Sequence, residues 1–100
     1  SEYKPAIKCA AVIEKCEEIF GFARGTLTRK TKNREIVRAR HLAIYLCREI
    51  TGRSYPQIGI AFNYRDHTTA LYAHKSAAPI ILRDPDMREV VRQVREHFGA

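Results

Sequence analysis

Long apolar runs are missing from this 100-residue sequence, and their absence excludes one class of protein. No stretch approaches the roughly 18 uninterrupted apolar residues that a membrane-spanning helix needs. No positively charged segment followed by an apolar one opens the chain, so no export signal is indicated. Tryptophan is absent as well. We expect no membrane partner, and we expect a single domain, because a chain of this length can bury only a modest core.

Cysteine is scarce, with three residues and no CxxC motif. An odd number at wide spacing does not indicate a disulfide framework, and reduced thiols are the default for such a chain. Cys9 and Cys16 lie seven residues apart on one helical face, which is typical of small buried hydrophobes. The histidines do not stand at ligand spacing: His41, His67, His74 and His97. We therefore expect no metal site and no cofactor.

Motifs for nucleotide hydrolysis and for nucleophilic catalysis are also missing. The sequence has no GxxxxGK[ST] loop and no Ser/His/Asp or Cys/His arrangement with supporting loops. Asp66 and His67 are neighbours at an expected helix start, where adjacent side chains do not face each other. The sequence therefore predicts that this chain is not an enzyme and contains no ATPase.

Acidic residues are few in one third of the chain, and all the excess positive charge lies there. Residues 21–55 hold nine Lys and Arg but only two acids, an excess that equals the whole net charge of +7. The remaining residues hold equal numbers of both signs. A localised excess indicates a polyanionic partner more strongly than a diffuse one does. The alternative is a solvated basic loop with no partner.

Apolar residues repeat at helical spacing over residues 5–20, and the pattern predicts an amphipathic linker helix at the N-terminus, residues 1–20. Pro5 suits its first turn, and Gly21 suits the position just past its end. Its later acids are expected to face solvent: Glu14, Glu17 and Glu18. That face is a candidate surface for a protein partner.

Residues 21–100 are expected to form an all-α helix-turn-helix domain. Together with the N-terminal helix, we expect five to six helices in the chain. A basic loop over 21–33 leads into a second helix over about 34–51, and no segment alternates as a strand would. Pro79 is expected to break a later helix at about 77, with Ile80-Ile81-Leu82 as a buried connector. Asp84-Pro85 has the pattern of a cap and first-turn proline for an amphipathic last helix.

The segment from about 54 to 77 has the layout of a helix-turn-helix. Ser54 and Gln57 are spaced as a capping box for a short helix, and Asn63-Tyr64 is expected to turn the chain. Asp66 has the properties of the N-cap of the next helix. That helix opens on five consecutive polar residues, Arg65-Asp66-His67-Thr68-Thr69. A helix that enters a DNA groove needs such donors and acceptors in its first turn.

Two strings in this region carry a family pattern. The first is Arg34-x-x-x-Arg38-Ala39-Arg40-His41-Leu42-Ala43-x-Tyr45-Leu46-x-Arg48-Glu49-x-Thr51-x-x-Ser54-x-Pro56-x-Ile58-Gly59-x-x-Phe62. The second is Arg65-Asp66-His67-Thr68-Thr69-Ala70-Leu71. With them, this stretch resembles the C-terminal DNA-binding domain (domain IV) of the bacterial replication initiator DnaA. The resemblance implies an all-helical, Trp-repressor-like fold and binding to a short A·T-rich box on double-stranded DNA. It also implies a cytoplasmic place at the bacterial nucleoid, in replication initiation or its regulation.

The resemblance implies roles for individual residues. Base contact is implied for four: Arg34, Asp66, His67 and Thr68. Contact with the DNA backbone is implied for six: Arg40, His41, Arg48, Tyr55, Pro56 and Thr69. Three further candidates for DNA contact are Lys32, Arg38 and Arg65. Of the base contacts, Arg34 matches an arginine that enters the minor groove, and the other three match readers of the major groove.

The chemistry of these side chains agrees with such roles. An aspartate accepts from the amino group of cytosine, and a threonine methyl packs on thymine. A guanidinium suits a narrow A·T minor groove, while other arginines fix register on phosphates. Simpler readings remain open: Asp66 caps a helix, Thr68 and Thr69 suit any helix start, and Arg65 can pair with an acid or with phosphate.

The sequence departs from the family pattern at several positions. Asn63-Tyr64 replaces the usual two glycines, Tyr72 stands where histidine is common, and His41 stands where glutamine is common. These changes bear on which box is preferred. Since DnaA's ATPase is absent here, the expected partners besides DNA are an ATPase domain preceding these residues or a separate initiator protein. The alternative function is a stand-alone regulator or interaction module that competes with an initiator or recruits one.

Overall fold

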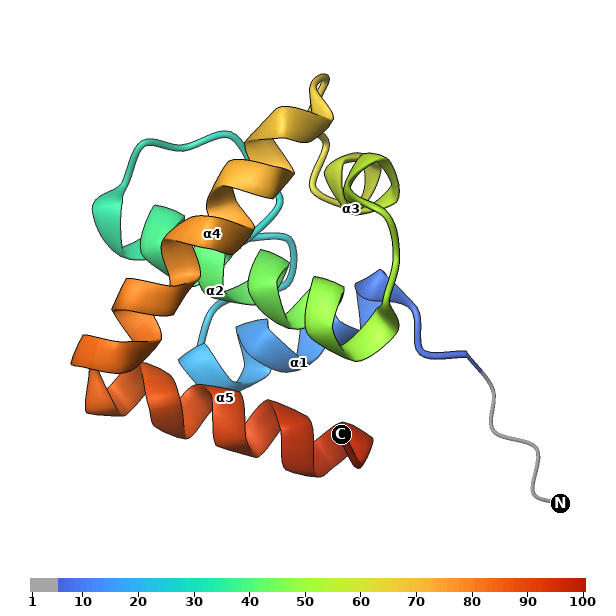
Figure 1. Cartoon of the computed structure of the whole chain (residues 1–100). Coiled ribbons are helices and arrows are strands. Elements are labelled where there is room, and N and C mark those ends of the chain that lie inside the picture. The colour runs from blue at the N-terminus through green and yellow to red at the C-terminus, as the bar shows by residue number, and fades with distance from the viewer. Residues whose placement is uncertain (1–5) are drawn as a thin grey trace, which may run out of the picture.

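Five helices make up residues 6–100, the part of the chain that the computed structural model describes (Figure 1). They are α1 (Cys9–Phe20), α2 (Arg34–Thr51), α3 (Tyr55–Ala61), α4 (His67–Arg83) and α5 (Pro85–Phe98). No strand occurs in that range. The predicted all-α class is confirmed. None of the described helices combines the length and apolarity needed to cross a membrane.

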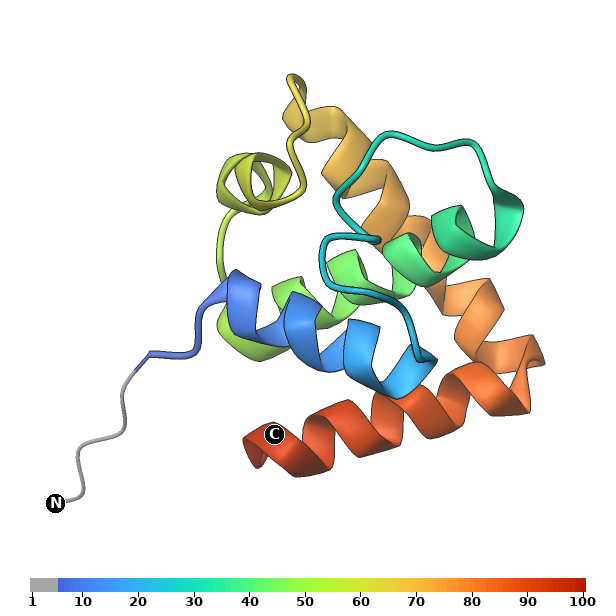
Figure 2. The same cartoon turned by 180° about the vertical axis from the view of Figure 1, so that it is seen from behind.

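Helix α2 is the central element of the domain. Helix α4 crosses one side of α2, and α1 packs on the other side (Figures 1 and 2). Helix α5 contacts all three of these helices. Because α2 is covered on more than one side, its middle is apolar around much of its circumference. Leu42, Ile44 and Leu46 are all fully buried there. The core is completed by residues from the neighbouring elements: Val12, Leu27, Ile58, Phe62 and Val94.

Helix α1 begins later than predicted and buries one of its acids. It starts at Cys9, while Pro5 lies outside the described residues. Gly21 ends it in the left-handed conformation, as expected. The prediction that Glu17 faces solvent is wrong. Glu17 is only 3% exposed, and its carboxylate accepts a hydrogen bond from the backbone N–H of Leu27 at 3.0 Å. A buried carboxylate needs such a donor, and the loop after α1 supplies it.

Helix α4 continues through Pro79, so the predicted break and buried connector are both wrong. The helix ends at Arg83, and Leu82 is 76% exposed. Pro79 lies on the exposed face, where water can replace the backbone hydrogen bond that proline cannot donate. The end of α4 is secured from α5, because Arg88 donates to the carbonyls of Ile81 and Leu82 at 3.0 and 2.7 Å.

The turn between α3 and α4 depends on one left-handed residue. Asn63 has φ of 63°, and no other non-glycine residue described here has a positive φ. Tyr64 therefore keeps an ordinary backbone and donates its N–H to the carbonyl of Gly59 at 2.8 Å. Asparagine tolerates this conformation better than most residues, so one left-handed position suffices where the family pattern has two glycines.

Three predicted caps are confirmed. Ser54 and Gln57 form a reciprocal capping box at α3. Asp66 accepts from the N–H of Thr68 and begins α4. Asp84 accepts from the N–H groups of Asp86 and Met87 and begins α5. These caps set where α3 and α4 start, and hence how the helix-turn-helix presents its polar tip.

Candidate nucleic-acid interface

The first turn of α4 projects from the body of the domain (Figure 1). Its polar side chains are exposed. Its exposed residues are Asp66, His67, Thr68 and Thr69. The backbone N–H of Thr68 donates to Oδ1 of Asp66 at 2.9 Å and lowers the pKa of that carboxyl below its ordinary value. Nδ1 of His67 lies 3.9 Å from the same oxygen, too far for a hydrogen bond. The tip therefore offers an anion and a ring whose nitrogens remain available to a ligand.

The basic loop is fixed at one buried residue, Leu27. Glu17 accepts from its N–H at 3.0 Å, and Arg40 donates from Nε to its carbonyl at 2.8 Å. Arg40 also donates from a terminal nitrogen to the carbonyl of Arg29 at 2.7 Å. Charged side chains from α1 and α2 thus bind the N–H and the carbonyl of the same loop residue. Arg40 is only 7% exposed. It positions the loop, a role that the sequence did not reveal.

The basic loop is also tied to the turn of the helix-turn-helix. Nδ2 of Asn63 donates to the carbonyl of Thr28 at 3.3 Å. The loop and the turn enclose an open groove of about 710 Å³. Its lining is Thr28, Arg29, Lys30, Thr31, Lys32, Arg40, Phe62, Asn63 and Tyr64. Asn63 therefore has two roles. It turns the chain between α3 and α4, and its side chain holds the basic loop beside this turn.

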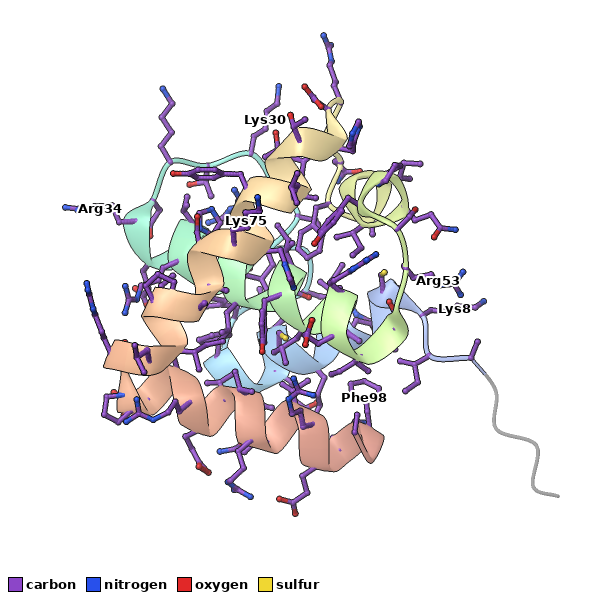
Figure 3. The ribbon with its side chains drawn as sticks, viewed as in Figure 1. Lys8, Lys30, Arg34, Arg53, Lys75 and Phe98 are labelled. Atoms are coloured by element: carbon purple, nitrogen blue, oxygen red, sulfur yellow. The ribbon has the colours of Figure 1, made fainter. Side chains whose placement is uncertain are left out.

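The exposed cations of the loop are spread along its length. Lys30 lines the groove together with Asn63 and Tyr64 of the turn before α4. Arg34, the first residue of α2, lies past the other end of the loop and points outward (Figure 3). Lys32 is exposed and lines the groove between loop and turn. Arg38, one helical turn after Arg34, pairs with Asp84 at 2.9 Å. Of these predicted contacts, Lys32 and Arg34 have no acidic partner within residues 6–100, and Arg38 is partly committed within the molecule.

A second cluster joins α2, α3 and α4. The guanidinium of Arg48 lies 4.6 Å from the ring centroid of Tyr55 and donates to the carbonyl of Arg53 at 2.7 Å. The hydroxyl of Tyr55 lies 3.2 Å from Nδ1 of His74, whose Nε2 is 3.3 Å from a carboxylate oxygen of Glu49. Arg48 and Tyr55 are thus half-buried and mutually oriented.

The other predicted contacts differ in exposure. Pro56 is exposed at the start of α3, and Arg65 is exposed just before the α4 cap with no acidic partner among the described residues. His41 is half-buried; burial and the nearby charge of Arg40 lower its pKa, which favours the neutral ring. A neutral imidazole can still donate one hydrogen bond to a phosphate oxygen.

Sequence reasoning missed an exposed stripe farther along α4. Thr68, Tyr72 and Lys75 follow one another at helical steps, and all three are exposed. They line a shallow depression of about 490 Å³ together with Thr69 and Leu71. Tyr72 is 70% exposed, and Lys75 points out from the middle of α4 (Figure 3). The helical spacing from Thr68 was the available signal.

The chemistry at this surface suits recognition. The tip of α4 supplies a carboxylate, an imidazole and hydroxyls, and the loop beside it supplies cations. Within residues 6–100, no group of three or more His, Cys, Asp or Glu side chains could hold a metal ion. A polyanion whose edges carry hydrogen-bonding groups complements such a surface.

Comparison with known proteins points to the same region. A family model described as the bacterial dnaA protein helix-turn-helix matches residues 9–76. The chain is 39% identical over 85 residues to the chromosomal replication initiator protein DnaA of Thermus thermophilus, covering 85% of this chain and 20% of that protein. It is 45% identical over 69 residues to the protein of that name from Corynebacterium aurimucosum, covering 69% of this chain and 13% of that protein. The chain thus spans a fifth or less of these curated relatives.

Proposed function

The chain belongs to the bacterial DnaA helix-turn-helix family, and from that membership we propose that it binds double-stranded DNA at DnaA-box-like sites, in replication initiation or its control. The observation that carries this proposal is the joint placement of two surfaces. The polar tip of α4 and the anchored basic loop are linked through the hydrogen bond from Asn63 to Thr28. One duplex can therefore meet both surfaces at a fixed spacing.

In this proposal the tip of α4 enters the major groove. Asp66 accepts from a cytosine amino group, His67 hydrogen-bonds a base edge, and the methyl of Thr68 packs on thymine. Thr69, one residue on, reaches a phosphate. The lowered pKa of Asp66 supports this assignment, because the carboxylate stays ionised and remains an acceptor at neutral pH.

The basic loop provides the contact with the neighbouring minor groove. Arg34 was the sequence-based candidate for insertion, and a guanidinium suits the narrow groove of an A·T-rich flank. Lys32 lies closer to the turn, since it lines the groove shared with Asn63 and Tyr64. We assign the insertion to the segment containing both, and Arg40 acts by holding the loop in place.

The α2–α3 corner provides contacts with the phosphate backbone. Pro56 is exposed at the start of α3, beside Tyr55 and the guanidinium of Arg48. Arg65 extends this role as an exposed cation, whereas His41 and Arg38 contribute less, since His41 is half-buried and Arg38 is paired with Asp84. Such contacts fix orientation on the duplex without reading sequence.

The proposal is tested by equilibrium binding of labelled box duplex and scrambled duplex over a salt series. We expect tighter binding to the box, and affinity that falls with salt by about 0.9 log unit per log unit of salt for each phosphate neutralised. Thr68→Ala should lose about 1–3 kcal/mol of discrimination at one base pair, while affinity for scrambled duplex stays unchanged.

The minor-groove segment that contains Lys32 and Arg34 is tested in the same assay with Lys32→Ala and Arg34→Ala. Each should reduce the preference for A·T flanks, and the larger loss identifies the inserted side chain. Equal affinity of the unaltered chain for both duplexes would remove the sequence-specific part of the proposal. Equal losses by Thr68→Ala and Arg34→Ala on every duplex would contradict the assignment of Thr68 to the major groove and Arg34 to the minor groove.

A further inference from the structure

Two of the three cysteines meet where the start of α1 packs on the last turns of α2. The thiol of Cys47 donates to the carbonyl of Cys9 at a sulfur–oxygen distance of 3.9 Å. The sulfur of Cys9 lies 3.9 Å from the hydroxyl oxygen of Thr51, which in turn donates to the carbonyl of Cys47 at 2.6 Å. The Cys47 side chain is therefore close enough to Cys9 to influence the charge state of its thiol. DNA recognition at the α4 tip does not use this cluster.

The surroundings of the two thiols are unequal. The hydrogen bond from Cys47 lowers the pKa of Cys9 to about 6 against the opposing effect of burial, with Thr51 and the charge of Arg53 acting in the same downward direction. The same hydrogen bond, together with burial, raises the pKa of Cys47 well above its ordinary value. Cys9 is also the first residue of α1, where no side chain caps the helix. The positive end of the helix therefore favours its thiolate.

Cys16 is a natural internal control. It is fully buried, and burial followed by the charge of Glu17 raises its pKa to about 12. Cys9 retains 8% of its surface, so a small oxidant reaches it first. Cys9 and Cys16 stand seven residues apart on one helix, a rise of about 10 Å, and cannot bond to each other.

We propose that Cys9 and Cys47 are a peroxide-responsive pair that closes into a reversible disulfide joining α1 to α2. The Cys9 thiolate attacks a hydroperoxide, so an S–O bond forms, the O–O bond breaks, and the leaving hydroxide takes a proton. The Cys47 sulfur then attacks the Cys9 sulfur: the S–S bond forms, the S–O bond breaks, and the released hydroxide takes the Cys47 proton. With hydrogen peroxide, two thiols become one disulfide and two waters are released.

Peptide mapping tests the proposal directly, because trypsin places each cysteine on its own peptide. These peptides cover residues 9–15, 16–24 and 41–48. The full chain is treated with hydrogen peroxide, free thiols are blocked with iodoacetamide, and the digest is read by mass spectrometry. We expect 9–15 linked to 41–48, with release by dithiothreitol, while 16–24 stays alkylated as in the untreated chain. Linkage through Cys16, bonds only between chains, or no linkage at all would each overturn the proposal.

Variants and rates separate reactivity from folding. Cys47→Ser should trap Cys9 as a sulfenic acid that dimedone labels, whereas Cys16→Ser should leave the disulfide intact. In the unaltered chain at pH 7, iodoacetamide should modify Cys9 about tenfold or more faster than Cys16 under native conditions. Equal rates for the two thiols would contradict the assignment even if a variant failed to fold.

Discussion

The basic loop and helix α5 contain similar numbers of cations, yet they use them in opposite ways. In α5, Arg92 pairs with Glu89 and Glu96, and Arg95 faces Glu49. In the loop over 21–33 there is no acid at all, and Lys30 and Lys32 remain exposed. The charges of α5 therefore cancel within the molecule. In the loop, Arg24 pairs with Glu14 at 2.9 Å, whereas Lys30 and Lys32 are left for an external anion.

The difference lies in how each backbone is supported. Helix α5 forms its own hydrogen bonds, so its arginines are free to pair across the surface with neighbouring acids. The loop has no such regular pattern, and it takes its shape from charged groups inside the molecule. Glu17 and Arg40 hold Leu27 from opposite sides. Two buried charged side chains thus fix the backbone of the loop. This explains how an irregular segment can present exposed cations at fixed positions.

The largest effect is expected from removing the internal support of the loop. Arg40→Met keeps the apolar stem but leaves the carbonyls of Leu27 and Arg29 without their donor. We expect the free energy of unfolding to fall by about 3 kcal/mol, as urea denaturation would measure. Affinity for box duplex should fall as well, since the loop cations lose their fixed positions.

Arg92→Met is the matched control on α5. Its partners are solvent-exposed acids, and exposed ion pairs contribute little. We expect no measurable change in either the urea midpoint or DNA affinity. If Arg40→Met were as mild as Arg92→Met, the loop would not depend on its buried guanidinium, and the contrast between the two regions would fail.

A smaller effect, confined to binding, is expected from the free cations of the loop. The double variant Lys30→Ala/Lys32→Ala should fold like the unaltered chain, because both side chains are exposed. The slope of log affinity against log salt should become shallower by about 0.9 for each phosphate that the variant no longer neutralises. Arg92→Ala should leave the slope unchanged. A steep slope retained in the loop variant would place the electrostatic contact elsewhere, with Lys75 on α4 as the next candidate.

The sequence predicted the regular parts of this comparison and missed the irregular one. Helical periodicity and caps located the helices and the polar tip of α4, because both signals are local. The burial of Glu17 and Arg40 could not be read from the chain, since each meets a loop peptide ten or more residues away. The prediction at Pro79 failed for a related reason. The free-energy cost of a proline inside a helix depends on whether its face of the helix is exposed to solvent, which tertiary packing decides.

The smallest effect concerns Asp84, where a cation of α2 is neutralised by the start of α5. The hydrogen bond from Arg38 lowers the pKa of the Asp84 carboxyl, aided by the N–H groups that it caps. A lowered pKa means that the ionised form contributes stability above the unfolded pKa of about 3.9, and that this contribution is lost as pH falls through the folded pKa. Asp84→Asn keeps a capping acceptor but removes the charge. Urea midpoints at about pH 5 and at about pH 2.5 should therefore differ less in this variant than in the unaltered chain, while Asp86→Asn serves as the neighbouring control. An unchanged pH dependence would mean that Arg38 is as free as the loop cations, and it would then join them as a phosphate contact.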